Sequence, residues 1–277
     1  MIKLLNELQI KYADHRLLYV PVAIYLVISL PVWFLAGSAA TPVLLGLLLL
    51  IILAGQIHLY RKTCVDMDHQ QRNIQALIDL HHRIDFRLPL PSLDNWTASP
   101  ELITRIFHLM KLYRPGVILE LGSGASSICG GYFCEHLGSG RLISLDHDID
   151  YAAFTRKHIN NHALDSYVEV RHAPLKECTI NGSSHLWYDL KVLDDIPVID
   201  MLVVDGPPHK TQLHARFPAL PLLMSKLAKN AVIILDDASR EQETEIVRRW
   251  ITEYPEFVIE FIPSDKGLCI LTRTSDV

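Results

Sequence analysis

Four positions between residues 120 and 237 end an apolar stretch with a carboxylate, and they are the residues best suited to chemistry. They are Glu120, Asp146, Asp205 and the pair Asp236-Asp237. A carboxylate is costly to bury without a partner, so four in succession suggest a shared role. Because the carboxyl ends of parallel strands open onto one crevice, we expect these groups to surround a single ligand site.

The first of these acids precedes a glycine turn. Residues 117–127 read Val-Ile-Leu-Glu-Leu-Gly-Ser-Gly-Ala-Ser-Ser, which indicates a buried strand, a turn at Gly122, Ser123 and Gly124, and a helix start. The glycines let the backbone approach a ligand closely, and the helix N-terminus faces it. Asp146 ends the next apolar stretch and can accept hydrogen bonds from both hydroxyls of a ribose. This combination predicts a nucleotide-type pocket.

Two residues indicate what kind of nucleotide it takes. A dinucleotide-binding loop has a third glycine where this chain has Ser127, and Glu120 would repel a pyrophosphate. Both speak against a nicotinamide-dependent oxidoreductase. A carboxylate at Glu120 instead suits a ligand with positive charge, such as an amino group or a sulfonium.

The remaining acids suggest a second binding function. Asp205, Asp236 and Asp237 offer oxygen ligands for a hard divalent cation such as magnesium. The alternative is that Asp236 or Asp237 only caps the following helix. Arg216 and Arg240 either hold an anionic group of a substrate or pair with neighbouring acids, and the sequence leaves both roles open.

From residue 96 onward, apolar runs and amphipathic stretches alternate regularly. We expect a proline-interrupted helix up to about 227 and a less regular stretch at 173–196. The pattern predicts a doubly wound, mostly parallel, seven-stranded Rossmann-like α/β sheet that ends in an antiparallel hairpin. The expected strands are 116–121, 141–146, 167–172, 199–205, 231–237, 257–262 and 268–272.

The N-terminal part has a different character, because residues 17–60 contain no Asp, Glu, Lys or Arg. A turn signal near 37–42 divides this run into two predicted transmembrane helices, about 17–37 and 41–60. Lysine and arginine flank both sides of the pair, which places both termini and the catalytic part in the cytosol, at a bacterial inner membrane. A helical hairpin buried in a soluble core, or one that enters a single leaflet, are the alternatives.

The predicted organisation therefore has three parts: a membrane anchor at 1–62, an amphipathic linker at 63–95 and a catalytic domain at 96–277. The formal net charge of -5 and the lack of a basic stripe speak against nucleic acid as a partner. The five cysteines are scattered without metal-ligand spacing, as is typical of a reducing compartment. The expected partner is the lipid bilayer, and the sequence does not indicate an oligomeric state.

Residues 96–277 resemble the class I S-adenosylmethionine-dependent methyltransferases, because Glu120-Leu-Gly-Ser-Gly124 matches their acidic glycine loop and Asp146 their ribose-binding acid. Asp205 and the Asp236-Asp237 pair resemble the metal-binding acids of catechol-O-methyltransferase-like enzymes, where the pair is usually Asp-Asn. The Asp-Gly-Pro-Pro turn, Arg216-Phe-Pro and Asp236-Asp-Ala-Ser-Arg240 are similar to a bacterial group labelled methyltransferase domain family 24.

The resemblance implies S-adenosylmethionine as cofactor and, by the metal-binding acids, a divalent cation. It also implies that the cofactor is bound by the acidic loop, the strand-end acids and the adenine-lining positions, namely Glu120, Gly122, Ser123, Gly124, Asp146, His147, Ala173 and Asp205. The lysine base of the catechol-type enzymes is replaced by Pro208, and His209 and Lys210 are the nearby candidates for a base. Without a metal, Asp205 or His209 would act as the base, with Arg240 as a further catalytic residue.

The expected reaction is O-methylation of a small-molecule, lipid or lipid-linked glycan acceptor at the cytosolic membrane face. Two alternatives are a non-catalytic, membrane-tethered module that binds S-adenosylmethionine and a related aminopropyl-type transferase.

Overall fold

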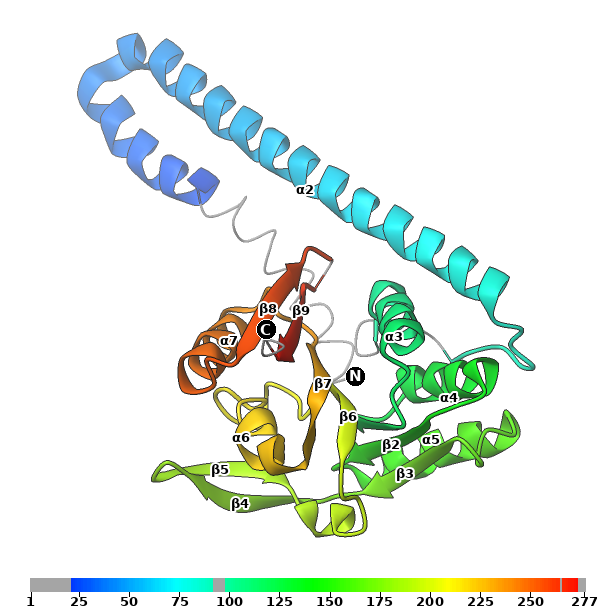
Figure 1. The fold of residues 1–277 in the computed structure, drawn as a ribbon. Coiled ribbons are helices and arrows are strands. Elements are labelled where there is room, and N and C mark those ends of the chain that lie inside the picture. The colour runs from blue at the N-terminus through cyan, green and yellow to red at the C-terminus, as the bar shows by residue number, and fades with distance from the viewer. Residues whose placement is uncertain (1–20, 92–97, 265, 274–277) are drawn as a thin grey trace. The chain divides into compact units, whose positions relative to one another are not determined.

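The computed structural model describes residues 21–91, 98–264 and 266–273 (Figure 1). The start of the first predicted span and the basic residues that precede it lie outside the described residues. The chain divides into two compact units, residues 1–70 and 71–277, which are considered separately.

The described part of the first unit is helical from Pro21 onward. The turn predicted near residue 37 is a short 3₁₀ helix, η1 (Gly37–Ala40), and α2 (Thr41–Arg83) follows directly. Two hydrogen bonds link the two sides of η1: the Tyr25 hydroxyl donates to the Leu44 carbonyl at 2.6 Å, and Trp33 Nε1 donates to Thr41 Oγ1 at 3.2 Å.

The structure does not separate this region into two spans and a linker helix. Among the described residues, one helical run, Pro21–Arg83, is long and apolar enough to cross a membrane, and none of its most apolar stretch is buried. The predicted end at residue 60 was placed where charged residues begin. However, α2 continues to Arg83, because neither proline nor glycine interrupts residues 61–83 and lysine, arginine and glutamine are good helix formers.

The second unit is built on the mixed sheet that the sequence predicts, with strand order β3-β2-β1-β6-β7-β9-β8 (Figure 1). Strands β3, β2, β1, β6 and β7 pair in parallel, and β9 is antiparallel to both β7 and β8. The strands are β1 (Val117–Leu121), β2 (Arg141–Asp146), β3 (Val168–His172), β6 (Ile199–Val204), β7 (Leu227–Leu235), β8 (Phe257–Ile262) and β9 (Leu268–Arg273).

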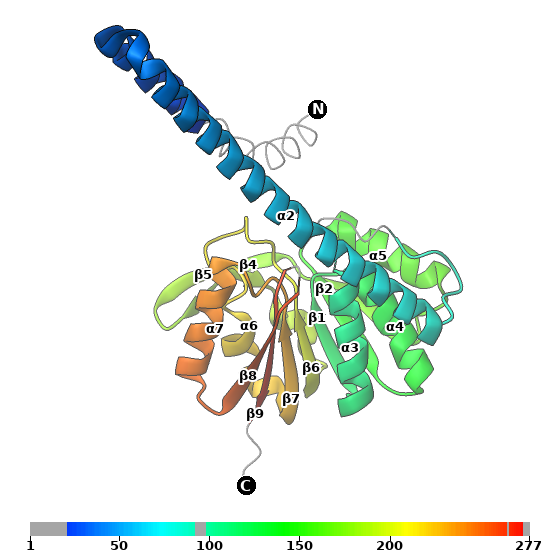
Figure 2. The same ribbon diagram turned by 90° about the horizontal axis from the view of Figure 1, so that it is seen from above.

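Helices cover both faces of the sheet, as the two views show (Figures 1 and 2). One face packs against α3 (Pro100–Tyr113), α4 (Ala125–Leu137) and α5 (Ile149–Asn161), and the other against α6 (Ala219–Leu223) and α7 (Glu241–Glu253). Alternate residues of each central strand enter opposite cores: Ile118 joins one and Leu119 the other. This two-sided burial explains why the central strands read as continuous apolar runs.

Two segments differ from the prediction. The stretch expected to be irregular, 173–196, contains a separate antiparallel hairpin of β4 (Leu175–Ile180) and β5 (Ser183–Tyr188). The helix expected up to 227 is reduced to α6 and the 3₁₀ turn η3 (Met224–Lys226), because the prolines before it favour turns and β7 already begins at Leu227.

Candidate functional site

The glycine turn between β1 and α4 forms the floor of the site. Gly122 has φ +101°, a conformation that L side chains rarely adopt, and a Cβ built on it would lie 3.2 Å from the Asp205 carbonyl oxygen. The Gly122 amide donates to the carbonyl of Leu145 on β2, and the Asp205 amide donates to that of Leu121 on β1. The three strand ends are therefore joined by main-chain hydrogen bonds directly at the turn.

Glu120 is buried on β1, with 1% of its surface exposed, and is surrounded by hydroxyl groups. Ser144 Oγ donates to Glu120 Oε2 at 2.7 Å, and Ser127 Oγ donates to the same oxygen. Burial raises the pKa of Glu120, while hydrogen bonds from serines oppose that rise by stabilising the carboxylate. Ser127, which replaces the third glycine of a dinucleotide loop, thus has a positive role as a donor to Glu120.

Asp146 ends β2 and holds the turn from the other side. Its Oδ2 accepts from the Ser123 amide at 3.1 Å and from the Ser123 hydroxyl at 2.7 Å, and its Oδ1 accepts from the Asp148 amide at 3.0 Å. A second hydroxyl, Thr155 Oγ1 on α5, lies 3.0 Å from Ser123 Oγ. Each carboxylate oxygen keeps further lone pairs with which to accept from a ligand hydroxyl.

The predicted adenine-lining residues lie next to Asp146. The Ala173 amide donates to the Asp146 carbonyl at 2.7 Å, and His147 Nδ1 lies 3.5 Å from Asp146 Oδ1. Tyr188, from the β4–β5 hairpin, faces the His147 ring at a centroid distance of 6.4 Å.

Tyr188 is a residue of this site that the sequence reasoning did not select. Its hydroxyl is buried without a hydrogen-bond partner among the described residues, and a Cβ built on Gly206 would come within 2.4 Å of it. Burial, followed by the negative charge of Asp146, raises the pKa of the phenol. The apolar residues around it gave no signal in the sequence, because β4 and β5 were not expected as strands.

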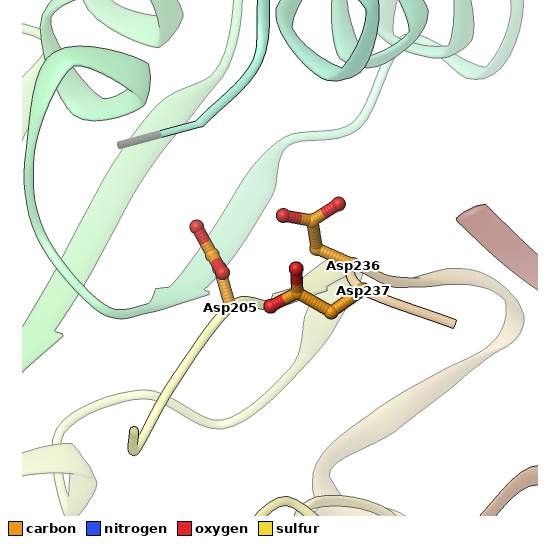
Figure 3. Close-up of side chains that lie close together, drawn as sticks. All are labelled: Asp205, Asp236 and Asp237. Atoms are coloured by element: carbon orange, nitrogen blue, oxygen red, sulfur yellow. The ribbon is translucent and has the colours of Figure 1, made fainter. Parts of the chain in front are cut away.

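The other acids meet where β6 and β7 end. Ligand atoms of Asp205, Asp236 and Asp237 all lie within 4.8 Å of one another, and Figure 3 shows the carboxylate of Asp237 turned toward Asp205. The sequence thus predicted correctly that these three side chains come together. The Asp236 amide also continues the ladder by donating to the Val204 carbonyl at 3.1 Å.

Arg216 enters this cluster from the segment before α6. Its Nη2 donates to Asp205 Oδ1 at 3.0 Å and to Asp237 Oδ2 at 2.8 Å, and its Nη1 donates to the Asp236 carbonyl at 2.8 Å. Only 3% of its surface is exposed. The sequence left two roles open for Arg216, and in the structure Arg216 forms ion pairs with the neighbouring acids.

Electrostatics differ among the three aspartates. Burial raises the pKa of Asp205 to about 6, against the opposing effect of Arg216. Burial, followed by repulsion from Asp205 and Asp237, raises the pKa of Asp236 to about 8. Both carboxylate oxygens of Asp236 are buried and have no hydrogen-bond partner in the described part of the chain. Burial acts to lower the pKa of Arg216, but the surrounding carboxylates outweigh it and the pKa is raised.

The two remaining candidates are on the surface. Arg240 Nη1 lies 2.9 Å from Asp237 Oδ2, and 42% of its side chain is exposed. His209 is exposed in the turn after Pro208. Neither is enclosed as the carboxylates are, so both are accessible to an acceptor substrate.

Comparison with known proteins identifies this unit. Residues 119–238 match the model of the family described as "Methyltransferase domain", family 24. They form a methyltransferase domain. No protein of curated function matches the chain.

Solved structures share its fold at low sequence identity. The SAH-bound methyltransferase PaMTH1 of Podospora anserina is 15% identical, with a TM-score of 0.50 over 72% of this chain and 88% of that one. An O-methyltransferase of Bacillus cereus in complex with SAH is 19% identical, with a TM-score of 0.49 over 75% and 90%. A methyltransferase of Geobacter sulfurreducens is 19% identical, with a TM-score of 0.46 over 62% and 78%. The second unit thus shares the fold of the Podospora anserina methyltransferase.

The resemblance implies two ligands, S-adenosylmethionine and a divalent cation, and the residues of this site suit only the first of them. S-adenosylmethionine fits, because Glu120 offers a carboxylate to an ammonium and Asp146 offers one to ribose hydroxyls. The turn also leaves room for a ligand at Gly124, where a Cβ would meet no atom within 4 Å. A divalent cation does not fit the acids as they stand, because a guanidinium already lies between Asp205 and Asp237.

Proposed function

We propose that this chain is a membrane-anchored O-methyltransferase that transfers the methyl group of S-adenosylmethionine to a hydroxyl of a small, lipid or lipid-linked acceptor at the cytosolic membrane face. The observation that carries the proposal is the pair of buried carboxylates, Glu120 and Asp146, at the ends of neighbouring strands around the Gly122 turn. This pair offers negative charge to a cationic ligand that also carries a ribose.

The residues of the turn hold the cofactor in this proposal. Glu120, to which the hydroxyls of Ser127 and Ser144 donate, accepts from the ammonium of the methionine part. Asp146 accepts from the ribose hydroxyls, with Ser123 fixing its orientation. His147 and Ala173 border the adenine. When bound, S-adenosylmethionine supplies a methyl group that is electrophilic because it is carried on a sulfonium.

Asp205 takes the proton of the acceptor hydroxyl. Its Oδ1 accepts from Arg216, and its side chain stays 20% exposed, so that Oδ2 remains open to an acceptor. A pKa near 6 leaves Asp205 ionised at neutral pH, as a general base requires. His209 and Arg240, both exposed beside the cluster, border the entry for the acceptor.

The membrane location rests on the first unit. Apolar side chains of α2 such as Leu49, Leu50 and Leu53 are each more than half exposed, and such a surface is unfavourable in water. We expect the chain to stay in the membrane fraction after alkaline carbonate washing. Recovery of the full chain in the soluble wash fraction would contradict the proposed membrane anchor, but it would not affect the proposed methyltransferase activity.

Titration calorimetry of the detergent-solubilised full chain tests cofactor binding. We expect S-adenosylmethionine and S-adenosylhomocysteine to bind and NADH not to bind. Asp146→Ala should weaken binding by about 100-fold, the loss expected when a charge-assisted hydrogen-bonding group is removed. Asp165→Ala, a change at an exposed acid on the turn before β3, is the matched control and should bind as wild type does. If neither sulfur ligand binds the folded wild-type chain, the proposal is wrong.

A further inference from the structure

The position of Arg216 bears on how the acceptor is activated. Three carboxylates that converge at strand ends are a donor set that suits a hard divalent cation. Here one guanidinium nitrogen, Nη2, lies 3.0 Å from Asp205 Oδ1 and 2.8 Å from Asp237 Oδ2. A positive charge already lies where the cation of this set would be.

Arg216 is held in that position by the core. The next residue, Phe217, is fully buried, and its carbonyl accepts from Trp250 Nε1 of α7 at 2.9 Å. Arg249 of the same helix lies over the Phe217 ring at 3.5 Å. For Arg216 to leave the cluster, this segment of the core would have to move.

The oxygens of this cluster also already accept several hydrogen bonds from arginine side chains. Asp237 Oδ2 accepts from two guanidinium groups, those of Arg216 and Arg240. Arg216 Nη2 further donates to the Asp205 main-chain carbonyl at 3.0 Å. A magnesium ion needs oxygens at about 2.0–2.1 Å, so it would have to displace these donors and lie beside a buried cation.

We propose that the buried Arg216 guanidinium permanently takes the place of a divalent cation among Asp205, Asp236 and Asp237, and that this chain binds no metal there. As a statement about catalysis this rests on the proposed function; as a statement about metal binding it does not. Arg216 is then a positioning residue, which holds Asp205 toward the acceptor, and the acceptor proton passes to a carboxylate without help from a metal.

Manganese binding to the detergent-solubilised full chain, followed by the paramagnetic resonance of free Mn²⁺, tests this directly. We expect no binding to the wild-type chain at millimolar Mn²⁺. Arg216→Ala removes the guanidinium and should create a site that binds Mn²⁺, and adding Asp236→Asn to it should abolish that site. Arg216→Lys, which retains the charge, and Arg248→Ala, on the exposed face of α7, should bind no Mn²⁺.

Each outcome decides the question. Mn²⁺ binding by the wild-type chain that Asp236→Asn weakens would overturn the proposal. A folded Arg216→Ala chain that binds no Mn²⁺ would also overturn the proposal. The three aspartates would then form no cation site even without the guanidinium. If Arg216→Ala does not fold, the wild-type measurement decides alone. Calorimetry with S-adenosylhomocysteine on the wild-type chain and on Asp146→Ala tests the proposed function separately, because it measures cofactor binding and not metal binding.

Discussion

Two groups of buried carboxylates end the central strands of one sheet, and they are stabilised in opposite ways. Glu120 and Asp146 are surrounded by hydroxyl and amide donors from Ser123, Ser127 and Ser144, none of which carries a charge. Asp205 and Asp237 are instead paired with a buried guanidinium. The donors around the first group are uncharged, which leaves a cationic ligand to supply the counter-charge, whereas Asp205 and Asp237 of the second group are already ion-paired with Arg216.

This difference assigns the two groups different tasks. Hydroxyl donors stabilise an ionised carboxylate without supplying a counter-charge, so a cationic ligand still gains from approaching it. A carboxylate paired with Arg216 gains little from a second cation, but it is held rigidly and can exchange a proton. We therefore expect cofactor binding to depend on the first group and acceptor chemistry on the second.

Loss of Arg216 should have the largest effect on stability. Arg216→Met leaves Asp205 and Asp237 buried without their counter-charge, and breaking such a pair typically costs about 3–5 kcal/mol. Urea unfolding followed by tryptophan fluorescence measures this cost. Arg248→Met, at an exposed position, is the matched control and should stay within about 0.5 kcal/mol of wild type.

Adding Asp237→Asn to Arg216→Met should recover part of that loss, because it removes one of the uncompensated charges. An Arg216→Met chain as stable as the Arg248→Met control would show that the aspartate cluster does not depend on the ion pair, and the contrast between the two groups would lose its basis.

The hydroxyl-lined group should respond more mildly. Ser144→Ala removes the 2.7 Å hydrogen bond to Glu120 and leaves a buried carboxylate less well satisfied, which costs about 1–3 kcal/mol. It should also weaken S-adenosylhomocysteine binding, because a higher pKa of Glu120 reduces its ionised fraction. Ser139→Ala, in the exposed turn before β2, is the control for both measurements. Unchanged binding by a destabilised Ser144→Ala chain would separate Glu120 from the cofactor.

Tyr188 should separate stability from binding. Its hydroxyl is buried without a partner, so Tyr188→Phe should leave the free energy of unfolding unchanged or raise it by up to about 1 kcal/mol. The same change should weaken S-adenosylhomocysteine binding about tenfold if the hydroxyl reaches the cofactor from beside Gly206. Tyr167→Phe, in the turn before β3, controls for loss of a phenol elsewhere. Equal binding by wild type and Tyr188→Phe would exclude this contact.

The sequence predicts the sheet well because the central strands are buried on both sides. Their continuous apolar runs and the acids that end them leave little choice of register, and all three aspartates lie together as expected. The hairpin of β4 and β5 was missed because it pairs outside the main sheet and much of it is exposed. Burial along β4 and β5 neither alternates regularly nor is continuous, so no periodic pattern marks these strands.

The sequence pattern did not predict the partners of Arg216 or the end of helix α2. Arg216 had two possible partners, an anionic substrate or the neighbouring acids, and only the tertiary structure places Nη2 between two carboxylates. At the N-terminus, the change from apolar to charged residues near Tyr60 was interpreted as the end of a helix. Charged residues indicate that a helix surface faces a polar environment, but they do not end the helix, and α2 continues to Arg83.

The pH dependence of stability tests the charged group most selectively, because it follows the titration of one side chain. Asp236 faces Asp205, Asp237, Arg216 and Lys266, and its pKa rises from 3.8 to about 8 on folding. The folded chain thus holds a proton that the unfolded chain has lost between those values, so this contribution is full below about pH 4 and is lost as the pH rises toward 8.

Asp236→Asn replaces the titrating carboxyl group and so removes the loss of stability that accompanies its ionisation as the pH rises. The stability of the variant should therefore rise relative to wild type as the pH increases from 5 to 8, by about 3–4 kcal/mol for a folded pKa near 8, which the thermal midpoint measures at each pH. A buried amide without partners costs free energy equally at every pH, so it shifts all the values of the variant and leaves the trend unchanged. Asp165→Asn, at an exposed position in the turn before β3, would not reproduce the trend. A pH-independent difference would mean that Asp236 is already ionised in the folded chain, with its charge balanced by Arg216 as for its neighbours.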